Sequence, residues 1–340
     1  MDTSGSLNLA KGYVKDAQKA SKSSWFSSPE WDTAAQYWDK AAGAYKTARH
    51  FEEAIDCHVK ASEAFTKVNA QYLAAKGYEY AASLAEKQLN DHAKTVKYYT
   101  HASDLYRLQG SSAERAAEMM EKAAKACEDI DTSQAIKMYE AALTIYETED
   151  RGRFSSGTFK KLTAYLIEKN RLSEAADVQL RFYAICEQIN NRFEINKCRL
   201  STIVLLLAFG DNVEAGKKMD EFSQNMDFVR TEEFAVADKM LHAYGNGDQE
   251  EFTQLARSQT VSFLDSAISR LAAKIRVPGA VRKEPPAQAS SAAVPRAIAS
   301  SAHPSASTAP ASFSAAQYNN NSSNSAAAGV PPEDEDDDLL

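Results

Sequence analysis

Residues 51–65 read FEEAIDCHVKASEAF, and the spacing within this stretch decides the fold. Ala54, Ile55, Ala61 and Phe65 share one stripe of a helix, because residues three, four and seven positions apart lie on one helical face. The last position of the stripe moves from 65 to 106, 146 and 186, in steps of 41, 40 and 40 residues. The stripe recurs at Thr95-Val96, Ala102 and Tyr106, then at Ala135-Ile136, Ala142 and Tyr146, and more loosely at Ala175-Ala176, Phe182 and Cys186.

A second alanine-rich helix precedes each of the first three stripes, and short polar turns at 49–50, 89–91, 128–129 and 170–171 separate the helices. Two helices in each repeat of about 40 residues predict an all-α fold of tetratricopeptide-like antiparallel helical hairpins stacked in a twisted sheet. A generic helical bundle whose alanine spacing arises by chance is the alternative. The alanines are Ala34, Ala35, Ala41 and Ala44, then Ala74, Ala75, Ala81 and Ala85, then Ala116, Ala117 and Ala124.

Proline divides the chain, because residues 30–277 contain none while seven of the nine prolines follow residue 280. Proline is costly inside a helix, so the body is predicted to be helical and the Ala/Ser/Pro-rich segment after it to be disordered. We expect a hairpin array over 1–225, a C-terminal helical bundle over 226–280, a disordered linker over 281–332 and an acidic motif over 333–340. Within 200–280, helices are predicted near 213–225, 231–245, 248–258 and 260–276.

Charge and motifs exclude several classes of protein. The net charge of −8 argues against a nucleic-acid binder, and the longest apolar run, 203–209, is far too short to cross a bilayer. Four widely spaced cysteines and the lack of a secretory signal predict a cytoplasmic protein. No phosphate-binding loop, catalytic motif or metal-ligand cluster is present, so we expect neither an enzyme nor a cofactor or metal.

Two aromatic residues, Trp25 and Phe26, stand in the Ser-rich connection between a first helix expected at about 7–21 and a second beginning near Trp31. They fold back onto a helix end, or they form an exposed loop that enters a membrane interface, where Trp and Phe are well suited. The residues alone do not choose between these two interpretations.

The chain ends in PEDEDDDLL, residues 332–340. Six consecutive carboxylates followed by two leucines suit a flexible hook for a basic partner, with a solubilising tail as the plain alternative. Basic residues on the helical hairpins are mostly expected on solvated faces, but a concave side of the array gathers some of them into a groove for an acidic rod-like partner.

The segments PEWDTAA (29–35), KAA (40–42), ARHFEEA (48–54), AAKGYE (74–79) and VPG (277–279), together with the acidic end, resemble the soluble NSF attachment proteins, the gamma type most closely. The resemblance covers about residues 7–280 and the last eight. It implies an adaptor for vesicular transport and membrane fusion: several copies coat a SNARE four-helix bundle, associate peripherally with the membrane, and recruit the hexameric ATPase NSF for SNARE disassembly.

The resemblance also assigns residues to these contacts. It places Trp25 and Phe26 in the membrane-attachment loop, and Asp336, Asp337, Asp338 and Leu339 in the motif that engages NSF. At one family position for gripping SNAREs this chain has Glu118 instead of a lysine. A generic tetratricopeptide scaffold or chaperone cofactor is the alternative function. The basic residues expected to contact the SNARE bundle are Lys122, Lys125, Lys160, Lys161, Lys197 and Arg199.

Overall fold

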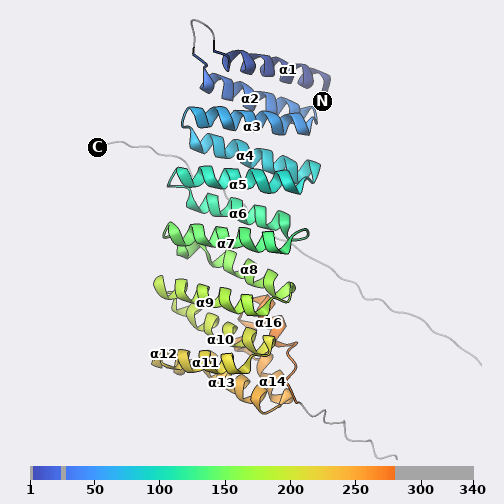
Figure 1. The fold of residues 1–340 in the computed structure, drawn as a ribbon. Helices are drawn as coiled ribbons and strands as arrows, with labels where there is room; N and C mark the ends of the chain where they lie inside the picture. Colours follow the sequence, from blue (N-terminus) through green and yellow to red (C-terminus); the bar gives the residue numbers. More distant parts are fainter. Residues whose placement is uncertain (1–2, 24–27, 280–340) are drawn as a thin grey trace, which may run out of the picture. The chain divides into compact units, whose positions relative to one another are not determined.

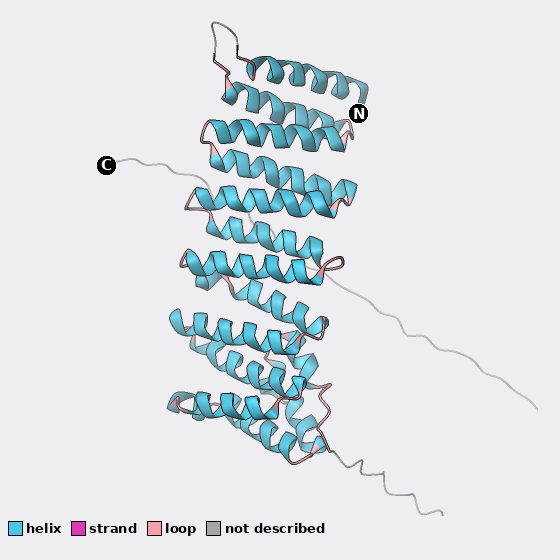
Figure 2. Ribbon diagram, viewed as in Figure 1, coloured by secondary structure: helices cyan, strands magenta, loops and turns pink. Residues whose placement is uncertain are grey.

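A computed structural model describes residues 3–23 and 28–279. Helices follow one another along this part of the chain, each packed against the next, and no strand occurs in the described ranges (Figures 1 and 2). The predicted all-α fold of helical hairpins is therefore confirmed. The first eleven α-helices are α1 Thr3–Ala20, α2 Trp31–Thr47, α3 Phe51–Lys67, α4 Gln71–Leu84, α5 His92–Leu108, α6 Ala113–Cys127, α7 Thr132–Thr148, α8 Ser156–Glu168, α9 Leu172–Gln188, α10 Arg192–Phe209 and α11 Asn212–Ser223.

The small residues of the repeat allow the helices to approach closely. Ala54 of α3, Ala102 of α5 and Ala142 of α7 are completely buried, as are the paired alanines 34–35 and 74–75 of the preceding helices. The aromatic position of the stripe is buried as well, at Phe65, Tyr106 and Tyr146. Alanine seams with an aromatic ring between them therefore hold successive hairpins together.

Short turns reverse the chain between helices. Asn69, Asn90, Asn170 and Asn190 adopt positive φ, a conformation that asparagine tolerates better than most residues. The amide of the following residue then caps the helix, as in the bonds from Ala70 N to Phe65 O (3.0 Å) and from Asn191 N to Cys186 O (2.9 Å). A five-residue π-helical turn, Ala85–Leu89, ends α4, and a 3₁₀ turn, Gly152–Phe154, precedes α8.

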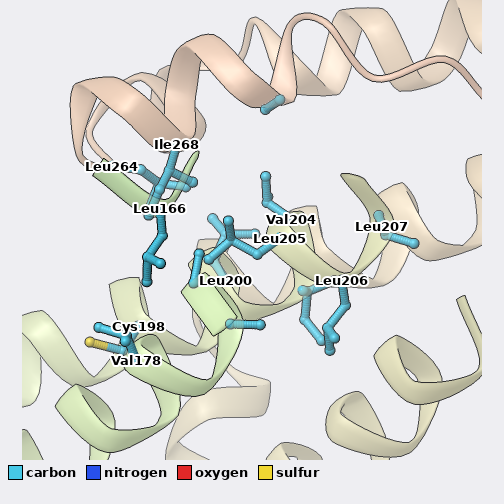
Figure 3. Close-up of a cluster of buried hydrophobic side chains, with 14 of the residues drawn as sticks. Leu166, Val178, Cys198, Leu200, Val204, Leu205, Leu206, Leu207, Leu264 and Ile268 are labelled. Atoms are coloured by element: carbon cyan, nitrogen blue, oxygen red, sulfur yellow. The ribbon is translucent and has the colours of Figure 1, made fainter. Parts of the chain in front are cut away.

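The C-terminal helices pack back onto the hairpins. One buried apolar cluster runs from Ala124 of α6 to Val277, and α10 lies within it, with residues 203–207 buried while Phe209 is exposed. Figure 3 shows Leu264 and Ile268 beside Leu166 in this cluster. Because the cluster is continuous across residue 225, the division between array and bundle stays a prediction. The remaining helices are α12 Met226–Val229, α13 Glu232–Gly245, α14 Gln249–Ala256, α15 Gln259–Ser262 and α16 Ser266–Ala272.

Two expected helix boundaries were wrong. The first helix begins at Thr3, four residues before the position predicted. The single helix expected over 260–276 is interrupted between α15 and α16, where Asp265 adopts extended ψ (139°) at the N-cap of α16 and Leu264 is buried. The chain thereby turns α16 onto α8 and α10 instead of continuing along one axis.

Gly77 provides a test of the close packing between α3 and α4. A Cβ atom at this position would overlap Ser62 Oγ and lie 3.1 Å from the carbonyl oxygen of His58. We expect Gly77→Ala to lower the free energy of unfolding by about 1–2 kcal/mol, because overpacking outweighs the better helix propensity of alanine. Urea unfolding measures this change. In a Ser62→Ala background the same substitution should cost little or nothing, and an equal loss in both backgrounds would contradict the steric explanation.

Candidate functional site

An open groove of about 700 Å³ lies between α6, α8 and α16. Helices α6 and α8 belong to the hairpins, while α16 comes from the C-terminal part of the chain, so the groove exists only because α16 folds back. Its walls are formed by Lys125, Glu128, Tyr139, Lys161, Ala164, Tyr165, Ile167, Glu168, Ala267, Arg270, Leu271 and Lys274.

Lys160 holds α16 in place. Its ammonium lies 3.4 Å from a carboxylate oxygen of Glu194 on α10 and 3.4 Å from one of Asp265, the residue that precedes α16. Partial burial alone would lower the pKa of Lys160, but the Asp265 and Glu194 carboxylates outweigh it and raise that pKa. The lysine therefore remains charged at neutral pH and ties α8, α10 and α16 together. Ile268 of α16 is completely buried.

Two tyrosines form the floor of the groove around Glu128. The Tyr139 hydroxyl donates a hydrogen bond to the Glu128 carboxylate (2.6 Å), and the Tyr165 hydroxyl donates to the Glu128 carbonyl oxygen (2.9 Å). Burial, reinforced by the Glu128 carboxylate, raises the pKa of Tyr139, so its hydroxyl stays a donor. The one carboxylate at the floor is therefore occupied by a neighbouring side chain.

The rim of the groove is basic. Lys125, Lys161, Arg270 and Lys274 are exposed, against the carboxylates of Glu128 and Glu168. Lys161 also contacts Glu121, but more than half of its side chain is exposed, and Glu168 is partly neutralised by Lys169 at 3.2 Å. Four cations converging on one open groove create a positive potential that attracts and orients an acidic partner.

Lys122 and Lys160, predicted to be contact residues, are already engaged inside the protein. The Lys122 ammonium lies 3.2 Å from Glu79 and 3.0 Å from Glu118, so both carboxylates partly neutralise it. Burial would lower the pKa of Lys122, but these hydrogen-bonded carboxylates raise it overall. Of the six basic residues predicted to contact the SNARE bundle, only Lys125 and Lys161 line the groove.

Arg199 requires a correction. Its residue exposure is 3%, and its guanidinium lies against the rings of Tyr183, Phe222 and Phe228 at 5.1, 5.8 and 4.8 Å. Arg199 therefore packs between α9, α10 and the helices that follow, and it is not part of an exposed grip. Lys197 lies elsewhere again, with its ammonium 4.2 Å from the ring of Phe193 at the start of α10.

Arg270 and Lys274 were missed by the sequence reasoning. Arg270 and Lys274 are four residues apart, with Ala267 before them and Leu271 between them. This spacing does indicate one face of a helix. The sequence gives no sign that this helix packs against α8, because the break at Asp265 and its ion pair with Lys160 are long-range features. Trp25, Phe26 and the motif from Asp336 to Leu339 lie outside the described residues.

The described ranges contain neither a metal-ligand cluster nor a membrane-spanning helix. No group of three or more His, Cys, Asp or Glu side chains there is arranged to hold a metal ion. None of the helices in the same ranges is both long and apolar enough to cross a membrane. All four cysteines are free and buried.

Comparison with known proteins supports the resemblance. The family model for soluble NSF attachment proteins matches residues 8–275. The chain is 30% identical over 266 residues to the gamma-soluble NSF attachment protein of Dictyostelium discoideum, covering 78% of this chain and 82% of that protein. It is also 30% identical to the gamma protein of Arabidopsis thaliana (73% and 84% covered) and 22% identical to the alpha protein of Vitis vinifera (74% and 87%). The chain therefore belongs to the soluble NSF attachment protein (SNAP) family.

Proposed function

We propose that this chain is an adaptor that binds SNARE complexes at membranes and recruits and stimulates the ATPase NSF for their disassembly. Proteins of the SNAP family are adaptors and not enzymes, and the two relatives named above that are 30% identical are NSF attachment proteins of the gamma type. The observation that carries the proposal for this chain is the basic groove between α6, α8 and α16.

The groove suits an acidic helical bundle because its cations stand on three separate elements. Lys125 projects from α6, Lys161 from α8, and Arg270 with Lys274 from α16 and its end. Cations on a rigid frame contact a charged surface at several points without reorganisation, which favours association rate and orientation. Apolar residues in the lining, such as Ala164, Ile167 and Leu271, offer additional burial to a side chain that enters between the cations.

Two further contacts complete the proposed mechanism. Trp25 and Phe26 would attach the adaptor to the membrane, and the segment containing Asp336, Asp337, Asp338 and Leu339 would engage NSF. Each contact alone is modest, so several copies acting on one SNARE bundle would supply avidity. With about fifty residues at roughly 5–6 Å × √n, the linker before the acidic motif would span about 40 Å, enough to act as a tether.

Reconstituted disassembly tests the proposal directly. SNARE complexes are incubated with NSF and ATP, with and without the full-length protein, and release of individual SNAREs is followed by fluorescence. We expect disassembly to depend on the protein. If no set of SNAREs responds, while the protein still binds other cytoplasmic chains, a generic tetratricopeptide scaffold becomes the better description.

Removal of residues 333–340 separates the NSF contact from the SNARE contact. Six carboxylates and two leucines are lost, so stimulation of NSF ATPase activity should fall to the level of NSF alone. Binding to the SNARE complex should persist, because the groove lies among residues 125–274. A matched variant that changes the same six acids to Ser, Asn and Gln tests the charge alone. Persistent stimulation by the truncated protein would contradict the role of this motif.

A further inference from the structure

Exposed apolar side chains recur at one set of helix connections. Because successive helices are antiparallel, the connections α3–α4, α5–α6, α7–α8 and α9–α10 lie along the same edge of the hairpins, as does the start of α2 (Figure 1). We call this the turn edge. On it a basic residue directly precedes an exposed apolar one at four successive connections: Lys67-Val68, Arg107-Leu108, Arg153-Phe154 and Arg192-Phe193.

The exposure of these apolar residues is large. Val68, Leu108, Phe154 and Phe193 are exposed to 40, 71, 51 and 68%. Within the described ranges, Arg107, Arg153 and Arg192 form no ion pair, so their guanidinium groups are not neutralised by a neighbouring carboxylate. The α7–α8 connection also carries Glu149, Asp150 and Arg151, so its net charge is zero, but the pairing of Arg153 with Phe154 is intact.

Contacts between neighbouring connections form them into a row. The Lys67 ammonium lies 3.4 Å from the ring of Trp31, where α2 begins, and Tyr72 meets Tyr106 at a ring distance of 5.7 Å. Further along, Arg151 lies 3.5 Å from Glu114 at the start of α6. Gly152 packs closely against Ile185 and Ile189 of the next connection. The row is therefore continuous from Trp31 at the start of α2 to the α9–α10 connection.

The opposite edge differs in charge. Its connections carry Asp91, Asp131 and Asp211, whose side chains cap the following helices, and its arginine and lysine at 169–171 pair with glutamates. Exposed apolar residues occur there too, namely Ile130 at 61%, Phe209 at 55% and Val213 at 65%, but none of them directly follows a lysine or arginine. Basic-apolar pairs thus distinguish the turn edge.

We propose that the turn edge binds the surface of an anionic lipid bilayer. Apolar tips enter the boundary between headgroups and acyl chains, and adjacent arginines meet lipid phosphates and carboxylates. Two helix layers separate successive tips by roughly 16–20 Å, and such isolated anchors fit a fluid surface better than a folded partner, which buries a contiguous patch. The row begins at Trp31, which follows Phe26 by five positions in the sequence, and the proposed function assigns Trp25 and Phe26 to the membrane.

This inference deepens the membrane contact of the proposed function, and vesicle binding without SNAREs or NSF tests it. The full-length protein is floated with vesicles of phosphatidylcholine alone or with about one third phosphatidylserine. The variant Leu108→Ser/Phe154→Ser/Phe193→Ser and the variant Arg107→Gln/Arg153→Gln/Arg192→Gln should each bind the anionic vesicles on the order of tenfold or more weakly. Only the anionic vesicles should show the arginine effect.

The matched control lies on the opposite edge. Ile130→Ser/Phe209→Ser/Val213→Ser removes equally exposed apolar side chains and should leave vesicle binding within about twofold of the unmodified protein. Since all the changed side chains are exposed, thermal unfolding should be unaltered in every variant. Trp25→Ser/Phe26→Ser should add its own loss to that of the turn-edge variants.

Three outcomes would overturn the proposal. In the first, the turn-edge variants bind vesicles normally. In the second, the control variant loses as much vesicle binding as the turn-edge variants do. In the third, the turn-edge variants lose SNARE binding in detergent, which would make the edge a protein contact. SNARE disassembly in detergent distinguishes this inference from the proposed function. A turn-edge variant that disassembles SNAREs normally in detergent but slowly on liposomes supports both, whereas wild-type protein that binds vesicles without promoting disassembly contradicts only the proposed function.

Discussion

Reversing the four groove cations, in the variant Lys125→Glu/Lys161→Glu/Arg270→Glu/Lys274→Glu, is expected to weaken binding to a SNARE complex on the order of 100-fold. The groove would change from four cations and two carboxylates to six carboxylates, so an acidic partner would meet like charge. Fluorescence anisotropy with a soluble SNARE complex in detergent measures the dissociation constant. Wild-type binding should also weaken as salt is raised, because exposed charges are screened within about 10 Å at 0.1 M ionic strength.

A matched control carries the same change in net charge elsewhere. Lys11, Lys46, Lys87 and Lys239 are exposed and do not line the groove, so their reversal to Glu should alter SNARE binding by no more than a few-fold. Equal losses in both variants would show that the overall charge of the chain matters and not the groove. Arg270→Glu/Lys274→Glu alone should already cause a clear loss, because half of the cations stand on α16 and its end.

The repeat could be predicted because its determinants are local in sequence. Small residues seven apart and an aromatic eleven positions after the first specify a helix face, and the step of about 40 residues specifies how the faces stack. Ala54, Ala102 and Ala142 are buried as that pattern requires. The short turns were predicted for the same reason, since residues such as Asn170 tolerate the positive φ that closes a helical hairpin.

Half of the groove could not be predicted, because its determinants are long-range. Asp265 interrupts a helix that local propensity would continue, and it does so where Lys160, more than a hundred positions earlier, supplies a cation at 3.4 Å. The spacing of a basic residue along a helix also does not determine its environment, because the residue can lie on a solvated face, form an internal ion pair or be buried. Lys125, Lys122 and Arg199 illustrate these three outcomes in turn.

Because Arg199 is buried, we expect its truncation to have a large effect on the stability of the fold. Its side chain fills a space bounded by Tyr183, Phe222 and Phe228, and it donates hydrogen bonds to the Tyr183 hydroxyl (3.2 Å) and to Asn196 (3.4 Å). Truncation in Arg199→Ala removes the cation–ring contacts and leaves a cavity between aromatic rings. We expect the free energy of unfolding, from urea denaturation, to fall by about 3 kcal/mol.

The matched variant Arg199→Met separates packing from charge. Methionine keeps most of the volume and its sulfur packs well against rings, while the loss of the guanidinium also removes a buried Nε that has no hydrogen-bond partner in the described part of the chain. Tyr183 retains its contact with Glu187. Arg199→Met should therefore remain within about 1 kcal/mol of the unmodified protein and should bind SNARE complexes normally. If this variant stays folded but binds SNAREs poorly, Arg199 acts at the interface after all, and its burial here does not describe the state that binds.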